Sequence, residues 1–297
     1  MNQPWDPDFT LDHSAVTALA RRCGLQGSPV PLGAGWDYAT FVCGDMVIRI
    51  PKRRATAKLL TDELELLLGL PDNLPLLAPR PRNELFAVDE IPYPAMVYPL
   101  LDGVQLCALP HALRVDATLI GLQLGGFLRS LHALPSGVAP RPFSFDEWTM
   151  FAQGHLGTIG EYGDHRLTNT LRHLLEQPLP VLDSLQVFCH MDLNDEHILI
   201  DTQSSQATAV IDWGDAGAGP WWFDFTGLWL WGDSAALDAA LSAYGLSLST
   251  NEIAWFRRHA LIVSIGALYC ELRIDPESET TRTWRARLGR SMHAAGR

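Results

Sequence analysis

The chain has 297 residues, of which 47% are hydrophobic and 19% are charged, and its mean hydropathy is +0.03. This composition supplies the apolar side chains of a packed core and excludes a disordered chain, a collagen-like fibre and a coiled coil. The 34 acidic and 22 basic residues leave a net charge of −12, which argues against a protein that wraps nucleic acid and suits a cationic small substrate.

The N-terminal third of the chain predicts short strands and two helices. In chain order we expect a helix capped by Asp12 and ended by Gly24, strands at 39–43 and 46–50, a helix at 55–70, and strands near 84–88 and 95–98. Gly44-Asp45 separates two runs rich in β-branched residues, which is typical of a hairpin. The longer helix carries an apolar stripe formed by Leu59, Leu60, Leu64, Leu67 and Leu68.

From residue 99 onward the pattern becomes mainly helical. We expect helices at 114–134, 145–160, 165–176 and 249–272, and strands at 187–189, 198–200 and 209–211. Ser249 and Glu252 have the spacing of a capping box, which marks a helix start. The arginine-rich residues 273–297 are interpreted as a solvated terminal helix. The sequence therefore predicts an α+β protein with two domains, 1–98 and 99–297.

Neither a membrane partner nor an oxidising compartment is expected. The longest nearly uncharged apolar stretch, 260–270, is shorter than the ~20 residues of a bilayer span, and residues 1–8 lack the apolar segment of a secretory signal. The cysteines are scattered without a C-x-x-C pair, which predicts buried reduced thiols and a cytoplasmic location. They are Cys23, Cys43, Cys107, Cys189 and Cys270.

The side chains best suited to bind a metal or to accept a proton lie between residues 188 and 215. Asp192 and His197 lie on a polar stretch between short apolar runs, and Asp212 ends the next apolar run. Two carboxylates and one further donor suit a divalent cation on a nucleotide, because hard cations prefer oxygen ligands. A carboxylate beside a cation-held phosphate can also accept the proton of a substrate hydroxyl. Ordinary turn residues would explain one of these aspartates but fit the whole spacing poorly.

Three motifs in this region resemble the aminoglycoside phosphotransferase superfamily. They are His190-x-Asp192-Leu-x3-His197-Ile-Leu-Ile, Ile211-Asp212-Trp213, and Gly219-Pro220-Trp-Trp-Phe-Asp224. The resemblance implies the bilobal fold of protein kinases, with a small β-rich N-terminal lobe that binds nucleotide and a larger, mainly helical C-terminal lobe that is catalytic. Histidine at 197, where most kinases have asparagine, resembles the macrolide 2′-phosphotransferase branch. Segments 36–38, 47–54 and 98–102 also resemble that branch.

This resemblance implies a role for each matched residue of the catalytic region. Asp192 matches the aspartate that takes or orients the hydroxyl proton, and His197 and Asp212 match the metal ligands. His190 and Asp224 match supporting residues, of which Asp224 accepts backbone N–H groups of the catalytic loop. The implied metal is Mg²⁺, with Mn²⁺ as the alternative because imidazole is a softer ligand than an amide oxygen.

The N-terminal part offers matching residues for the nucleotide. Gly33 and Gly35 suit a loop that approaches phosphates without Cβ atoms, although a plain turn explains this pair equally well. Arg49 occupies the position of the phosphate-holding kinase lysine, and its expected partner is Glu63, with Glu65 as the alternative. The hinge, whose backbone pairs with a purine edge, is matched by Met96, Val97 and Tyr98.

Together these features predict a small-molecule kinase that transfers the γ-phosphoryl group of GTP or ATP to an antibiotic hydroxyl. The resemblance favours the 2′-hydroxyl of a macrolide amino sugar and GTP. Three alternatives remain: an aminoglycoside or metabolite alcohol as acceptor, a non-catalytic nucleotide-binding pseudokinase, and a metal-dependent hydrolase with His190, Asp192 and His197 as ligands. Most aromatic residues at 213–231 are expected in the core, while a subset with Trp148 and Phe151 is a candidate lining of an apolar cleft.

Overall fold

The computed structural model describes residues 7–34, 37–109, 115–135, 144–162 and 165–296. The chain divides into a first unit, Met1–Gln105 with Ile198–Asp215, and a second unit, Leu106–His197 with Ala216–Arg297. The first unit therefore extends beyond the boundary predicted at residue 98 and takes in a later hairpin. Assignment of nucleotide binding to one domain and catalysis to the other stays a prediction.

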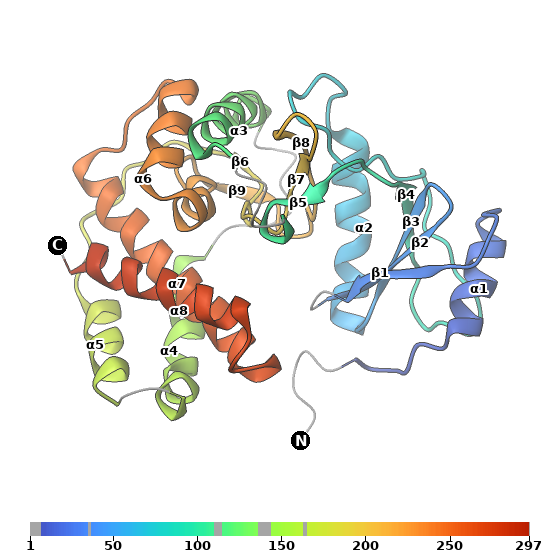
Figure 1. Ribbon diagram of the computed structural model, residues 1–297, viewed down its shortest axis with the longest axis horizontal. Coiled ribbons are helices and arrows are strands. Elements are labelled where there is room, and N and C mark those ends of the chain that lie inside the picture. Colours follow the sequence, from blue (N-terminus) through green and yellow to red (C-terminus); the bar gives the residue numbers. More distant parts are fainter. Residues whose placement is uncertain (1–6, 35–36, 110–114, 136–143, 163–164, 297) are drawn as a thin grey trace. The chain divides into compact units, whose positions relative to one another are not determined.

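A four-stranded antiparallel sheet forms the framework of the first unit (Figure 1). Its strands follow each other in space as along the chain: β1 (Val30–Ala34), β2 (Tyr38–Cys43), β3 (Met46–Pro51) and β4 (Met96–Pro99). The predicted hairpin between β2 and β3 is confirmed, and Gly44 adopts φ +64° at its turn, where glycine has no Cβ penalty. The strand predicted near 84–88 is wrong, since only Phe86 bridges to Ala95 in a segment whose prolines lack N–H donors.

Two helices lie on opposite sides of this sheet (Figure 1). α1 (His13–Arg22) begins at Asp12, whose carboxylate accepts the Ser14 N–H as predicted, and packs against Ile48 and Ile50 of β3. α2 (Arg54–Gly69) buries Leu60, Leu64 and Leu67 but leaves Leu68 45% exposed. The predicted stripe is thus wrong at Leu68, because α2 turns Thr56 and Glu63 inward in its place.

A second, smaller sheet completes the first unit. β5 (Val104–Gln105), β7 (Ile198–Asp201) and β8 (Gln206–Val210) form it in the order β5-β7-β8. Leu77 forms two backbone hydrogen bonds with β8. Its N–H donates to the Thr208 carbonyl oxygen at 2.9 Å, and its carbonyl oxygen accepts the Val210 N–H at 2.8 Å. This pairing fixes the hairpin, at whose end Asp212 lies, within the first unit.

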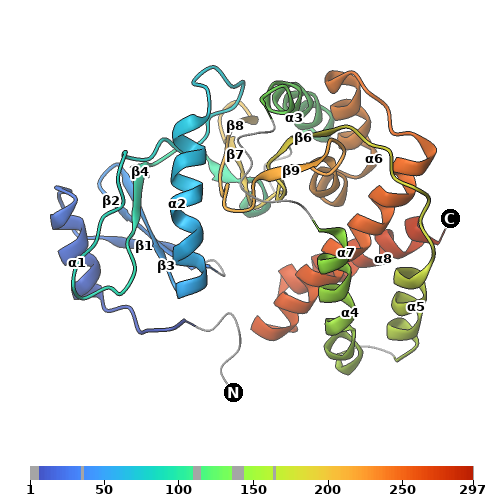
Figure 2. The same cartoon turned by 180° about the vertical axis from the view of Figure 1, so that it is seen from behind.

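The second unit is mainly helical, as predicted (Figure 2). Its elements are the 3₁₀ turn η1 (Leu106–Ala108), α3 (Ala117–His132), α4 (Phe145–Glu161), α5 (His165–Glu176), α6 (Phe225–Tyr244), α7 (Thr250–Ile274), α8 (Glu279–Ala295) and the antiparallel pair β6 (Gln186–Cys189) and β9 (Gly217–Pro220). The helix predicted from 114 begins at Ala117, because Asp116 caps it. Neither α6 nor β9 was predicted, since α6 is apolar on nearly all sides and shows no helical period.

Glycines allow α3 and α6 to approach closely. A Cβ atom on Gly121 would lie 2.4 Å from the Ala236 carbonyl oxygen, and one on Gly125 would lie 2.2 Å from that of Ala240. α8 in turn packs against α7 through Trp284 and Leu288. The solvated terminal helix predicted at 273–297 is therefore wrong for this face of α8.

The described residues also bear on the predictions about the cysteines and about membrane-spanning helices. All five cysteines are free thiols: Cys23, Cys43 and Cys189 are buried as predicted, while Cys270 is half-buried and Cys107, on the short η1 turn, is exposed. Within the described ranges, no helix combines the length and the apolar character needed to cross a bilayer.

His259 of α7 makes stability depend on pH. Its ring lies among aromatic side chains, with centroids 3.7 Å from Phe223 and 5.9 Å from Trp148, and burial lowers its pKa to about 3. The unfolded chain therefore binds one more proton than the native state between about pH 3 and pH 6.5, so stability falls as pH decreases through this window.

We expect this residue to reduce the free energy of unfolding by about 2 kcal/mol between pH 7 and pH 5. Urea unfolding of the wild type and of His259→Gln at both pH values measures it, since glutamine retains a partner for Thr226 and does not titrate. As pH falls, the free energy of unfolding should decrease less in the variant than in the wild type. Identical pH dependence would mean that His259 has the same pKa in the native and unfolded states.

Candidate active site

The loop between β6 and β7 holds Asp192 and His197 in one hydrogen-bonded turn. The Asn194 amide donates to Asp192 Oδ1 at 2.9 Å, and Asn194 Oδ1 accepts the Glu196 N–H at 2.8 Å. His197 Nδ1 lies 2.8 Å from the Asp192 carbonyl oxygen and 3.5 Å from Asp192 Oδ2. The Asp192 side chain is 42% exposed, so this carboxylate is oriented by its neighbours and still accessible.

Asp224 anchors the start of this loop. Its two carboxylate oxygens accept the backbone N–H groups of His190 and Met191, each at 2.8 Å. These are the backbone contacts that the resemblance implied for Asp224, and its role in supporting catalysis stays a prediction. Met191 adopts φ +71°, a left-handed conformation that costs a non-glycine residue about 1–3 kcal/mol and persists only where its surroundings enforce it. The fully buried His190 ring accepts the Asp192 N–H at 3.3 Å, which agrees with a supporting position.

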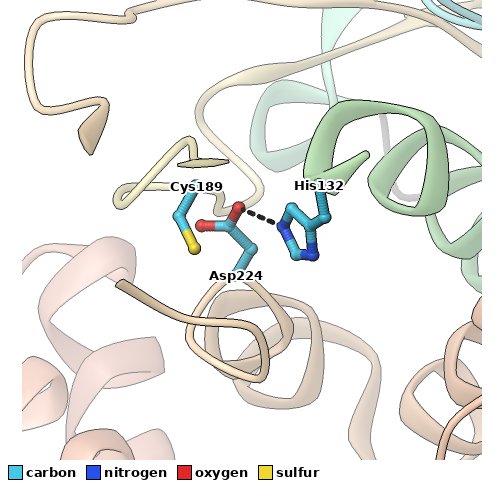
Figure 3. Close-up of side chains that lie close together, drawn as sticks. All are labelled: His132, Cys189 and Asp224. Atoms are coloured by element: carbon cyan, nitrogen blue, oxygen red, sulfur yellow. Dashed lines mark hydrogen bonds and ion pairs between the residues drawn. The ribbon is translucent and has the colours of Figure 1, made fainter. Parts of the chain in front are cut away.

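His132 of α3 completes the anchor and was not predicted. Its Nε2 lies 3.1 Å from Asp224 Oδ2 (Figure 3), and its Nδ1 lies 2.9 Å from the Tyr244 hydroxyl. Burial by itself would raise the pKa of Asp224, but the hydrogen bond and charge of His132 and the backbone N–H of His190 outweigh burial and lower it. Asp224 is therefore a carboxylate at neutral pH, as an acceptor of several N–H groups must be.

His132, Cys189 and Asp224 bring three potential metal ligands within 4.8 Å of one another (Figure 3). The Cys189 thiol, however, is directed to the carbonyl oxygens of Gly219 and Pro220 at 3.7 and 3.6 Å. Burial also raises its pKa well above the usual value, and a metal requires the thiolate. The group is a hydrogen-bonded structural anchor.

Two more elements of the second unit contact the middle and the end of the loop. Gly227 of α6 packs so closely that a Cβ atom would lie 2.0 Å from the Leu193 carbonyl oxygen. Arg287 of α8 donates to both carboxylate oxygens of Asp195, at 3.0 and 2.6 Å. Sequence reasoning missed both residues, because each lies far along the chain from the loop and belongs to no motif.

In the first unit, Arg49 of β3 is the centre of a buried ionic cluster. Its guanidinium pairs with Glu63 of α2 and with Asp212, and its Cζ lies 3.7 Å from the Tyr38 ring centroid. Burial by itself would lower the pKa of Arg49, but the charges of Glu63 and Asp212 outweigh it and raise the pKa. The pairing of Arg49 with Glu63 is confirmed, since Glu65 lies on the exposed side of α2.

Asp212 adopts the left-handed conformation, with φ +63°, and its side chain is 43% exposed. An aspartate in a strained backbone conformation, two residues after the end of β8, is a feature that functional sites often show. Because Arg49 holds one oxygen of this carboxylate, its direction is set within the first unit. Its role as a metal ligand stays a prediction.

The remaining nucleotide-binding predictions fall on β1 and β4. Gly33 pairs with Thr40 next to an irregularity in β1, whereas Gly35 lies outside the described residues. Met96 and Val97 are buried, Tyr98 is half-buried, and the Val97 carbonyl accepts the Arg82 N–H at 2.9 Å. The hinge role of this segment stays a prediction.

Most of the aromatic residues after the loop belong to the core, as expected. Trp213, Trp221, Trp222, Phe223 and Phe225 are buried, and Trp229 and Trp231 are half-buried. On α4, by contrast, Phe151 is 44% and Met150 is 62% exposed. These two side chains are available to an apolar partner.

The chain as a whole is similar to a known protein family and to several solved structures. The sequence profile of the phosphotransferase enzyme family matches residues 29–261. The GDP complex of wild-type aminoglycoside 2′-phosphotransferase-IIIa is similar with a TM-score of 0.74 at 18% identity, over 95% of this chain and 99% of that one. The macrolide 2′-phosphotransferase MphH from Brachybacterium faecium, as apoenzyme, has a TM-score of 0.62 at 22% identity, over 93% and 97%.

A third similar structure, the streptomycin–ATP–APH(2")-IIa ternary complex, has a TM-score of 0.60 at 16% identity, over 95% of this chain and 97% of that one. No curated protein sequence matches the chain. The likeness to these structures shows the fold, and the kinase-like α+β prediction is confirmed, with a small antiparallel sheet in the N-terminal part and helices in the C-terminal part.

Proposed function

The chain belongs to the phosphotransferase enzyme family, and from this membership we propose that it transfers the γ-phosphoryl group of GTP or ATP to an antibiotic hydroxyl, namely the 2′-hydroxyl of a macrolide amino sugar. The observation that carries the chemistry is the loop of Asp192 and His197, which Asp224 anchors through two N–H groups. Phosphoryl transfer depends on positioning and charge neutralisation more than on covalent catalysis, and a hydrogen-bonded loop that presents the accessible carboxylate of Asp192 meets that requirement.

Asp192 is the group that we assign to the acceptor. Its carboxylate orients the acceptor hydroxyl and takes its proton while the hydroxyl oxygen bonds to the γ-phosphorus and the bond to the bridging oxygen of the nucleoside diphosphate breaks. Asn194 keeps Asp192 Oδ1 in place through its amide donor. Arg49, held by Glu63, neutralises negative charge on the nucleotide phosphates.

The residues present fit a divalent cation. His197 Nδ1 lies 2.8 Å from a backbone carbonyl oxygen, the arrangement in which a metal-binding histidine commonly holds its other ring nitrogen. Asp212 supplies a partly exposed carboxylate. A bound Mg²⁺ or Mn²⁺ would neutralise the charge of the phosphates.

Two features support a macrolide as the acceptor. Histidine at 197 matches the branch that acts on macrolides, and Met150 and Phe151 offer exposed apolar surface on α4 for a large apolar ring. An aminoglycoside is the second candidate, favoured by the TM-score of 0.75 with the GDP and kanamycin complex of APH(2")-IIia, which exceeds the 0.62 with MphH.

The test is a transfer assay with the purified protein and Mg²⁺. GTP and ATP are each offered with a 14-membered macrolide, kanamycin or choline, and the product is examined for one added phosphate by mass spectrometry. We expect transfer to the macrolide, a higher kcat/KM with GTP than with ATP, and loss of transfer when EDTA removes the metal. Asp192→Asn, which should transfer phosphate far more slowly, is the control.

Other outcomes of this assay would support the alternative functions. Phosphorylation of kanamycin alone would establish the aminoglycoside candidate, and phosphorylation of choline alone a metabolite kinase. Nucleotide binding without transfer to any acceptor would indicate a pseudokinase. A thermal-shift measurement separates that case from a protein that binds no nucleotide, because a ligand that binds the native state raises Tm.

A further inference from the structure

We propose that Arg287, on the C-terminal helix α8, is a positioning residue for phosphoryl transfer, which it supports by holding the Asp192 loop through Asp195. The inference rests on the proposed function of that loop. Arg287 Nη1 and Nη2 lie 3.0 and 2.6 Å from the two Asp195 carboxylate oxygens. Both side chains are more than nine-tenths buried, and they lie 92 residues apart in the sequence.

The geometry of this pair restricts the motion of the Asp195 side chain more than a single contact would. The planar guanidinium matches the carboxylate with two parallel hydrogen bonds, which set orientation as well as distance. Arg287 is itself fixed, because its Cζ lies 4.5 Å from the Trp284 ring centroid. The Ser291 hydroxyl on the next turn lies 2.9 Å from that of Ser264 on α7. α8 is therefore a firmly packed support for the guanidinium.

The pair acts on the part of the loop that carries the chemistry. Asp195 stands between Asp192 and His197, and its carbonyl oxygen accepts the Cys107 N–H at 2.9 Å. Asp224 holds the beginning of the loop and Gly227 contacts its middle. Arg287 and Cys107 hold its end. Of these two residues, Arg287 is the one that holds the end of the loop through a charged side chain.

Removal of Arg287 would leave the Asp195 carboxylate buried without its cation. Such a charge is strongly unfavourable in the protein interior, so Asp195 would turn toward water and displace the neighbouring peptide groups. A shift of about 1 Å in a catalytic group can cost about 10²-fold in rate. Arg49 and Glu63 belong to the first unit and keep their own pairing, so nucleotide affinity should change far less than turnover.

The experiment compares Arg287→Met with Arg287→Lys and with Arg282→Met, a matched control on the exposed side of α8. We expect Arg287→Met to lower kcat by about 10²-fold with KM for the nucleotide within about twofold of wild type. Lysine, which keeps the charge but lacks the fork, should recover part of kcat, and Arg282→Met should behave as wild type. A further variant, Arg287→Ala, serves for chemical rescue. Added guanidinium chloride at millimolar concentration should raise its kcat, whereas potassium chloride should not.

Hydrogen exchange of the amides at 190–197 provides a readout that needs no activity. Exchange there should be faster in Arg287→Met than in wild type, with α3 and α6 unchanged. If wild type transfers no phosphate, the proposed function fails while the exchange result still tests the positioning role. Should Arg287→Met fail to fold, Arg287→Lys and Asp195→Asn are measured in its place. Wild-type kcat and wild-type loop exchange in a folded variant would overturn the proposal.

Discussion

Replacing Asp192 with asparagine is expected to lower kcat by about 10²- to 10⁴-fold, the range that a positioned general base contributes. Asparagine has nearly the same shape as aspartate but cannot take the acceptor proton. The Asn194 amide donor 2.9 Å from Oδ1 still finds an oxygen there, so the loop should keep its conformation. Nucleotide affinity should therefore remain close to that of wild type.

Steady-state kinetics and calorimetric titration of the nucleotide measure the two quantities separately. Asp238→Asn is the matched control, because Asp238 is an exposed aspartate on α6 away from the loop. A variant that turns over as fast as wild type would exclude Asp192 as the base. A variant that has lost nucleotide binding as well would show that the loop conformation depends on the charge of this carboxylate.

Asp224→Ala should lower the free energy of unfolding by about 3–5 kcal/mol, the cost of breaking a buried ionic arrangement by removing one partner. The backbone N–H groups of His190 and Met191 lose their acceptor, and so does the His132 ring nitrogen. All three donors are buried, and each one that remains unsatisfied is unfavourable by about 1–3 kcal/mol. The left-handed Met191 also loses the contact that enforces its conformation.

Asp116→Ala provides the comparison, since both aspartates precede a helix. Asp116 caps α3 by accepting the Thr118 N–H at 2.8 Å, and loss of an ordinary cap costs about 1 kcal/mol. Asp224 stands at the same position before α6 but makes no capping hydrogen bond. Urea unfolding should therefore distinguish the two variants clearly, and equal losses would mean that Asp224 acts merely as a helix cap.

Local patterns in the sequence were sufficient for several elements and for part of the candidate site. Asp12 and the capping box of Ser249 with Glu252 located two helix starts, because capping involves residues only a few positions apart. The hydrogen bond from the loop backbone to Asp224 and the pairing of Arg49 with Glu63 are also present as predicted. The contact of Asp224 came from the resemblance of a short motif, in which the spacing of the residues carries the information. No motif distinguished Glu63 from Glu65, and the choice between them was settled by which residue of α2 faces inward.

Only the tertiary structure decided which distant residues meet those motifs. His132, Gly227 and Arg287 contact the catalytic loop from three helices, and no local pattern distinguishes them from other residues of their kind. Arg287 is the clearest case, since an arginine in a charged C-terminal helix predicts a solvated side chain until Asp195 is placed opposite it. Hydrogen bonding and burial depend on neighbours brought together by folding, whereas capping and turn formation depend on neighbours along the chain.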